Sequence, residues 1–529
     1  MKKEVDDKFK LDQQKHEVGS RTAGMASFMV FGRFISLFLA GVAFIVVARI
    51  LGPSTYGIYT LAISFSGFFG SVADLGVGMA INKFIAEYTA KKKKAEIDSV
   101  ISNGYLSVLI TGLFFTLIAF SMSHFIAMHL LGNANQQYVI QVVSFCILGA
   151  MLFSLSYNIM IGFGKGYYVA IVIITQSLVQ AILSIILSIT GFGAIAPIFG
   201  ILIGYMVSVA VVILILLAKF KTKIVKPSIK RLKELLGFSY AISIYNILRG
   251  IVWNLSPIIL GVFATIIVVG NFGVAIKTSA IISNVTDALG LAVLPMFAYT
   301  ISTKSIGKEI GKFYNYALYM TFAITTPALL YLSILSKQFS FTIFSAKYLL
   351  APSYISIISV GTLLWIIATY TNMLLISSDR VKEMLKYSII IAFIEITLLF
   401  VLAPKFGGLG VTFLLYIVTP VLITLFMSKA AKDLLGIKIE IKKLAKLFGA
   451  GIISAAFLIP IILLLPSHYI ITLVLGAIEQ IIIYPVILSY TGAAGKEDLK
   501  LLRQVTAGIP VINRIIRIMA DYSAYFARK

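Results

Sequence analysis

The chain has 529 residues, of which 59% are hydrophobic and only 12% are charged, whereas soluble domains carry about 25% charged residues. Its formal net charge is +24, but the basic residues lie between long apolar runs, as in membrane proteins, so we expect no nucleic-acid partner. The single cysteine, Cys146, excludes disulfide bonds within the chain and cysteine-rich metal sites. The composition therefore predicts an integral membrane protein with no metal site and no cofactor.

The apolar runs begin after a polar tail, residues 1–23, whose mixed charge is unlike a signal peptide. Each run has roughly 20 residues, enough to cross a bilayer core of about 30 Å as a helix. The runs are continuous rather than alternating, so they are helices and not barrel strands. They predict an all-α fold with about fourteen transmembrane helices: 24–50, 57–80, 100–122, 137–163, 167–190, 195–218, 237–263, 265–298, 313–335, 352–377, 387–403, 407–427, 447–466 and 468–490.

The distribution of Lys and Arg predicts the orientation of these spans. With the N-terminus in the cytoplasm, 38 of the 45 Lys and Arg residues fall in cytoplasmic segments, four in outside loops and three within spans. Cytoplasmic loops of membrane proteins collect these residues. We therefore expect a multi-pass protein of the plasma membrane with both termini in the cytoplasm. The outside loops are too short for a catalytic domain, so we expect no enzyme.

The basic loops divide the chain into segments. After Pro227, Ser228 predicts the start of a short basic amphipathic helix on the membrane surface. The predicted segments are a cytoplasmic N-tail (1–23), an N-terminal six-helix lobe (24–218), a basic linker (219–236), a C-terminal six-helix lobe (237–427), a basic loop (428–446), two additional transmembrane helices (447–490) and a basic amphipathic tail (491–529).

The two lobes share an internal repeat. An offset of 216 residues carries Arg33 onto Arg249 and the run Tyr56–Ile58 onto Phe272–Val274. Spans 1 and 7 therefore correspond, as do spans 2 and 8, in the same orientation. Parallel repeats of six helices are a transporter architecture, with the substrate path between the halves.

Four short motifs follow one another in the first two spans and the loop after them: Ala48–Pro53 (ARILGP), Tyr56-Gly57, Asp74–Gly76 (DLG) and Lys83–Ile85 (KFI). This series resembles the N-terminal signature of the polysaccharide-biosynthesis (Wzx-type) oligosaccharide flippase family, in the MATE/MOP transporter superfamily. The resemblance implies two six-helix bundles in a V shape plus two C-terminal helices. It also implies export of lipid-linked oligosaccharides by alternating access. Multidrug exporters share that fold, so the fold alone does not choose the substrate.

Ionisable residues inside the predicted spans are candidates for function, because insertion scales assign about 2.5–3.5 kcal/mol to Arg, Lys or Asp at a helix centre. Arg33 with Asp74, and Arg249 with Asp287, form either structural ion pairs or parts of a substrate site. Lys277 has no acidic residue at a matching depth in its own half, and an unpaired cation suits a lipid diphosphate. The candidate substrate-binding residues are Arg33, Arg249, Lys277, Asn254 and Asn284. The candidates for coupling or ion pairing are Asp74, Asp287 and Glu395, of which Glu395 either carries a coupling proton or packs in a neutral form.

The sequence thus predicts a flippase that moves polyprenyl- or dolichyl-diphosphate-linked oligosaccharide from the cytoplasmic to the outer leaflet. Its expected partners are that lipid-linked oligosaccharide, membrane lipids, a coupling proton or sodium ion, and glycan-assembly proteins. Two alternatives stay open. One is an ion-coupled exporter of organic cations or drugs in the same superfamily, and the other is a non-transporting membrane scaffold of a glycan-assembly complex.

Overall fold

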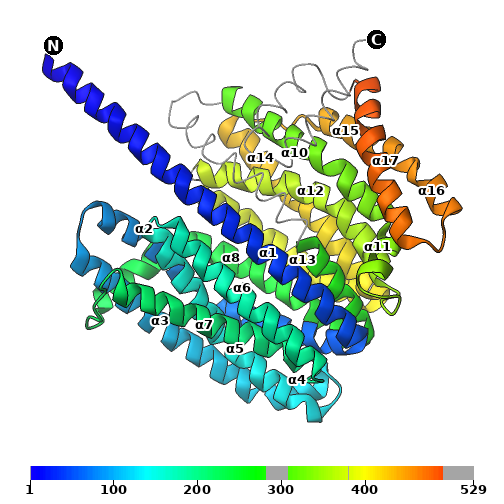
Figure 1. The fold of residues 1–529 in the computed structure, drawn as a ribbon, viewed down its shortest axis with the longest axis horizontal. Helices are drawn as coiled ribbons and strands as arrows, with labels where there is room; N and C mark the ends of the chain where they lie inside the picture. Colours follow the sequence, from blue (N-terminus) through cyan, green and yellow to red (C-terminus); the bar gives the residue numbers. More distant parts are fainter. Residues whose placement is uncertain (1, 281–307, 379, 493–529) are drawn as a thin grey trace. The chain divides into compact units, whose positions relative to one another are not determined.

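The computed structural model describes residues 2–280, 308–378 and 380–492, and the regular structure within these ranges is helical (Figure 1). The chain divides into two compact units, Met1–Val262 and Phe263–Lys529. Each unit is described by itself below.

The first unit is a bundle of long apolar helices. Within it α6 packs against α1 and α7, and α5 packs against α2, α3 and α7. Its helices are α1 (Lys2–Ala73), α2 (Val77–Ala90), α3 (Lys94–Ser121), α4 (Ser123–Leu130), the short 3-10 helix η1 (Ala134–Gln136), α5 (Gln137–Gly162), α6 (Gly166–Ile189), α7 (Ile195–Ala218) and α8 (Ile229–Phe263).

Helix α1 contains most of the first two predicted spans, joined by a sharp backbone turn. Gly52 has φ 68° and ψ 173°, and Pro53 follows it. A positive φ is accessible to glycine without steric cost, and proline is favoured in the first turn of a helix because it lacks the N–H that would be unsatisfied there. The Gly52-Pro53 pair therefore ends one span and starts the next.

The second predicted span, 57–80, is wrong in its continuity. Helix α1 ends at Ala73, and α2 begins at Val77 after Gly76, whose φ is 73°. The carboxylate of Asp74 accepts a hydrogen bond from the Gly76 backbone N–H at 2.9 Å. An aspartate that bonds the backbone two residues on forms an Asx turn, which competes with helix continuation. The Asp74-Leu75-Gly76 motif is thus a helix break.

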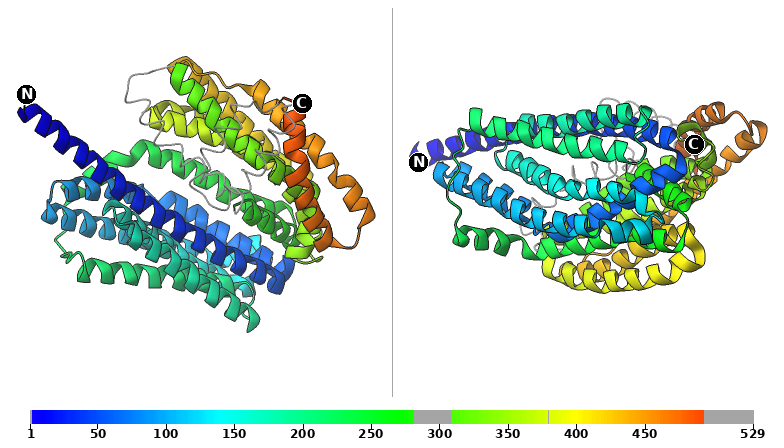
Figure 2. Two further views of the ribbon diagram at one scale, coloured as in Figure 1. Left: turned by 45° about the horizontal axis from the view of Figure 1, so that its top comes forward. Right: turned by 90° about the horizontal axis from the view of Figure 1, so that it is seen from below.

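The second unit is also helical, and α12 packs against α10, α13 and α14 at its centre. The two additional helices predicted near the C-terminus are present, and α16 and α17 lie side by side (Figure 2). The described helices of the unit are Ile266–Ala280, α10 (Lys308–Ile334), α11 (Ser336–Ile343), α12 (Ala351–Ser377), α13 (Val381–Phe413), the π-helix η2 (Leu414–Val418), α14 (Thr419–Leu435), α15 (Ile441–Ala456), α16 (Leu458–Leu464) and α17 (Tyr469–Tyr490).

The additional helices are attached to α10 by an apolar core. Leu330 and Leu335 pack with Ala455 and Leu458, and all four are buried. Burying apolar surface between protein helices fixes their packing even where lipid surrounds the rest of each helix. Helix α17 also contacts α10 and α15, so the additional helices are integral parts of this unit.

The helix lengths confirm the predicted all-α membrane fold. Eleven stretches of helix in the described part are long and apolar enough to cross a membrane. Two of them, Ser27–Ala73 and Lys382–Asp433, have 47 and 52 residues, more than twice the length that a bilayer core of about 30 Å requires. Each contains a break, at Gly52 and at Gly407 (φ 56°). With these breaks the described helices correspond to thirteen of the fourteen predicted spans, and Ile266–Ala280 is the described part of the remaining one, 265–298.

The linker between the predicted lobes differs from its prediction. A helix does begin directly after Ser228, but it continues without interruption to Phe263 as α8. The separate surface helix predicted there is therefore wrong. The boundary between the compact units falls after Val262, so span 237–263 lies with the first six spans in this structure. The division into repeat lobes at 24–218 and 237–427 stays a prediction, and the amphipathic tail lies outside the described residues.

Candidate functional site

The second half of α1 and the membrane part of α8 pack against each other at glycine residues. We call this contact the span 2–span 7 seam. Three close approaches run in antiparallel order along it: Leu61 with Gly261, Gly67 with Asn254, and Ser71 with Gly250. A methyl group on Gly261 would lie 2.6 Å from Leu61 Cδ2, closer than side chains pack. The seam therefore depends on small residues, as close helix contacts in membranes commonly do.

Asn254, a predicted substrate-binding residue, lies in this seam. Its side-chain amide donates to the Ser71 hydroxyl at 3.3 Å and to the Gly250 carbonyl oxygen at 2.8 Å. A Cβ on Gly67 would overlap the Asn254 amide. In this structure Asn254 therefore joins two helices, and contact with a substrate stays a prediction that requires the seam to open.

The two predicted arginines lie at equivalent positions of the repeat. Arg249 is partly buried and directly precedes Gly250 of the seam, whereas the side chain of Arg33 on α1 is exposed. Arg33 lies close enough to Tyr157 for its charge to act on that hydroxyl. Asp74, the predicted partner of Arg33, is exposed in the helix break and bonds Gly76. The ion pair of Arg33 with Asp74 stays a prediction.

Lys277 lies near the end of the helix Ile266–Ala280, and most of the residues just before and after it are buried. Thr278 next to it is buried and bonds the Val274 carbonyl oxygen at 2.9 Å. The Lys277 side chain itself is exposed and has no hydrogen bond or ion pair with any residue in the described ranges. Lys277 is thus a cation within an apolar helix, available to a partner of opposite charge. Asn284 and Asp287, the other candidates of this span, lie outside the described residues.

Glu395 is fully buried on α13. Sequence reasoning missed a second carboxylate, Glu479 on α17, although its position in a continuous apolar run was signal enough. One Glu479 oxygen accepts from the Gln480 amide at 2.9 Å, and Gln480 in turn accepts from the Ser454 hydroxyl at 3.1 Å. The other Glu479 oxygen is buried without a hydrogen-bond partner among the described residues. Within those residues no three His, Cys, Asp or Glu side chains gather as a metal site.

The fold is similar to several solved transporters. One is the lipid II flippase MurJ in an inward closed conformation, with a TM-score of 0.69 and 16% identity over 87% of this chain and 98% of that one. Another is an inward-facing multidrug resistance MATE family transporter, with a TM-score of 0.65 and 16% identity over 77% of this chain and 98% of that one. A third is a MOP superfamily transporter from Pyrococcus furiosus, described as having a binding pocket of reverse polarity. Its TM-score is 0.55, with 16% identity over 78% of this chain and 96% of that one. No curated protein matches the sequence.

These likenesses and the helix arrangement define a multi-pass membrane protein with the fold of the MOP transporter superfamily. Residues 25–301 match the family model described as polysaccharide biosynthesis protein, which is more than half of the chain. The chain belongs to the polysaccharide biosynthesis protein family, as the four N-terminal motifs predicted.

Proposed function

We propose that this protein is a flippase that moves a polyprenyl- or dolichyl-diphosphate-linked oligosaccharide from the cytoplasmic to the outer leaflet of the plasma membrane. The headgroup crosses along polar residues between the repeat halves while the lipid tail stays in the bilayer. No covalent bond forms or breaks, so the protein acts as a transporter and not as an enzyme. Membership of the polysaccharide biosynthesis family supports this choice of substrate class.

The observation that carries the proposal furthest is the position of Lys277. This ammonium group lies in an apolar helix and has no partner of opposite charge in the described ranges. A charged side chain in a membrane is retained where it serves a function or meets a partner. Lysine binds phosphate as a compact point charge, so a diphosphate headgroup would supply the missing anion.

The span 2–span 7 seam supports transport by alternating access. Spans 2 and 7 come from different halves of the predicted repeat. The seam begins near the ends of these two spans that are expected to face the outside of the cell. It extends from Leu61 to Ser71, about 15 Å along the helix at 1.5 Å per residue. When the two helices separate, the hydrogen bond between Asn254 and Ser71 would break and the close contacts at the glycines would open. The proposal requires this separation for release to the outer leaflet.

The test is transport of a fluorescent lipid-linked oligosaccharide by the purified full-length chain in vesicles. Lys277→Ala should insert and accumulate normally, because it removes an unpaired charge. Its transport should fall about ten- to a hundredfold, as expected for loss of a charge-assisted contact of about 1.5–3 kcal/mol. Lys277→Arg should keep part of the activity, and Lys277→Glu none.

Lys347→Ala is the matched control, because Lys347 is an exposed cation in a loop of the same unit. It should transport at the original rate. Full transport by Lys277→Ala at normal abundance would remove Lys277 from the substrate path. Transport of an organic cation that persists or rises in Lys277→Ala, with no flipping of lipid-linked oligosaccharide by the original chain, would instead favour the multidrug exporter.

A further inference from the structure

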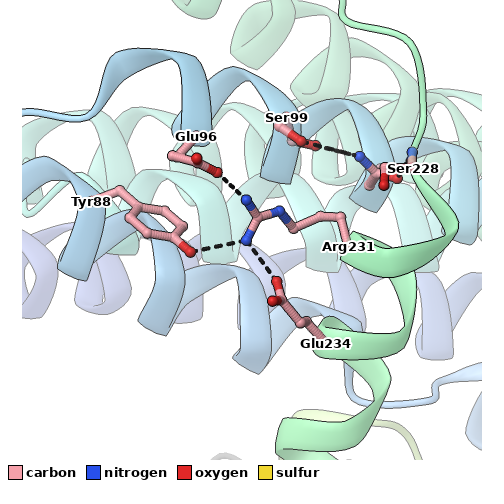
Figure 3. Close-up of polar contacts among 7 residues, drawn as sticks. Tyr88, Glu96, Ser99, Ser228, Arg231 and Glu234 are labelled. Carbon is pink, nitrogen blue, oxygen red and sulfur yellow. Dashed lines mark hydrogen bonds and ion pairs between the residues drawn. The ribbon is translucent and has the colours of Figure 1, made fainter.

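The basic linker runs into the first turn of α8, where Arg231 contacts residues at the end of α2 and the start of α3 (Figure 3). Arg231 donates from one terminal nitrogen to the Tyr88 hydroxyl at 2.9 Å and to the Glu234 carboxylate at 2.7 Å. Its other terminal nitrogen forms an ion pair with Glu96 at the start of α3. The guanidinium also lies 5.5 Å from the centre of the Tyr88 ring. We call this set of four residues the linker clasp.

Two backbone hydrogen bonds fix the linker just before the clasp. The Val225 N–H donates to the Ser102 hydroxyl at 3.0 Å, and the Ser228 N–H donates to the Asn103 side-chain oxygen at 2.8 Å. Both acceptors lie two to three residues inside the predicted span 100–122. With the span boundary predicted at residue 100, the linker backbone would run at the level where α3 enters the membrane.

The linker also contacts α3 at a side that carries exposed apolar residues. Ser102 starts a series of residues at helical spacing, Leu106, Leu109 and Leu113, whose apolar side chains are exposed. Residues spaced by three or four lie on one face of a helix. An exposed apolar stripe on a membrane helix faces lipid, so Ser102 marks the inner end of such a stripe.

The linker presents both apolar and basic side chains to its surroundings. Ile224 is 95% exposed and Ile229 is 76% exposed, which is unfavourable in water. Six lysines of the linker are exposed, and none has an ion pair within the described ranges. They are Lys219, Lys221, Lys223, Lys226, Lys230 and Lys233. The acidic side chains of the clasp pair with Arg231. The lysines of 219–235 are therefore available to bind an anionic partner outside the chain.

We propose that the linker is a docking surface for anionic phospholipids of the leaflet on the side expected to be cytoplasmic. Ile224 and Ile229 insert at the boundary between headgroups and acyl chains, and the surrounding lysines contact lipid phosphates. The combination of exposed isoleucines, unpaired lysines and a backbone fixed to α3 near the predicted span boundary matches interfacial lipid binding. The clasp holds this surface against α3, so its position does not depend on a separate amphipathic helix.

The test uses a fluorescent probe at position 224. Ile224→Cys, with the buried native thiol removed by Cys146→Ala, is labelled with an environment-sensitive dye in the full-length protein. The protein is placed in vesicles of phosphatidylcholine with or without phosphatidylglycerol. In the anionic vesicles the emission should shift to shorter wavelength and be quenched by a nitroxide attached to the lipid. Both effects should weaken as salt is raised, because screening reduces attraction between exposed charges.

Two charge variants complete the experiment. Changing Lys221, Lys223, Lys226 and Lys230 to Gln should abolish the difference between the two lipid compositions. The matched control changes Lys429, Lys432, Lys442 and Lys446 to Gln, which removes the same charge from exposed positions near the adjoining ends of α14 and α15, and should leave the difference intact. Equal quenching of the probe by aqueous iodide in both lipids would overturn the proposal. So would lipid quenching that the linker lysine changes do not alter.

Discussion

The amide of Asn254 on α8 and the hydroxyl of Ser71 on α1 are joined by a hydrogen bond of 3.3 Å. The two residues belong to spans 7 and 2, which the repeat assigns to different halves of the chain. Around them the helices meet at Gly67 and Gly250, where an added Cβ would lie within 3 Å of the side chain opposite, so that a neighbour would have to shift. A polar contact lined by glycines allows two membrane helices to pack closely against each other.

A disulfide across the seam tests whether spans 2 and 7 must separate during transport. A Cβ on Gly250 would lie 2.8 Å from Ser71 Cβ, and disulfides need a Cβ separation of about 3.5–4.5 Å, so a shift of roughly 1 Å admits the bond. Ser71→Cys with Gly250→Cys, in a Cys146→Ala background, should lose transport on oxidation and regain it on reduction. The single-cysteine variants should not respond to oxidant. A fully cross-linked protein that still transports at the original rate would show that the seam stays closed throughout.

Two glycines one helical turn apart provide a matched test of the packing at the seam. An added methyl on Gly67 overlaps the Asn254 amide, whereas one on Gly70 meets nothing within 4 Å. Gly67→Ala should therefore destabilise the protein by about 1–3 kcal/mol, as overpacking does. Gly70→Ala should be neutral or stabilise it by about 1 kcal/mol, because alanine favours a helix. Thermal unfolding of both variants in detergent measures the difference, and equal melting temperatures would argue against a tight seam.

The sequence predicted the spans well because lipid imposes a single strong requirement, about 20 apolar residues in helical form. The repeat was also informative at the residue level, since the equivalent Tyr56 and Phe272 are both fully buried. The break at Asp74 was missed because hydrophobicity continues through it. The signal lay in local turn chemistry, an aspartate two residues before a glycine.

The candidate site could be predicted only in part, because burial of a polar residue does not say what it contacts. Asn254 was a candidate substrate ligand because it is a polar side chain within a predicted span, and here it bonds Ser71 and the Gly250 carbonyl oxygen. Hydrogen bonds between distant helices depend on packing geometry that one sequence does not encode in a readable pattern. Glu479 is a different case, because a carboxylate within the apolar span 468–490 was visible in the sequence and could have been predicted as a candidate.

Glu479 should orient the neighbouring Gln480 amide, which accepts from Ser454 on α15 and so joins α17 to that helix. Glu479→Gln keeps an acceptor oxygen and should leave stability unchanged. Glu479→Leu leaves the buried Gln480 amide without that acceptor, which should cost about 1–3 kcal/mol. The melting temperature of the detergent-solubilised protein distinguishes them. If the Gln variant melts normally but transports poorly, the carboxyl group has a role in ion coupling that its structural contact does not require.

The linker clasp should control how readily the linker opens, and its lysines make this measurable with trypsin. The Arg231 side chain is 15% exposed and that of Glu96 is 41% exposed, so we expect a coupling within the range of about 0.2–1 kcal/mol found for exposed pairs. Near the upper end, Glu96→Gln should speed cleavage at Lys221–Lys226 about two- to fivefold, because cleavage follows the population of the open form. Arg231→Gln should do at least as much, since it also loses Tyr88 and Glu234. The double variant should be cleaved no faster than Arg231→Gln alone.

Glu383→Gln is the control for this experiment. It removes an exposed ion pair with Arg380 away from the linker and should leave the cleavage rate unchanged. Multiplying effects in the double variant would mean that Arg231 and Glu96 act on the linker independently.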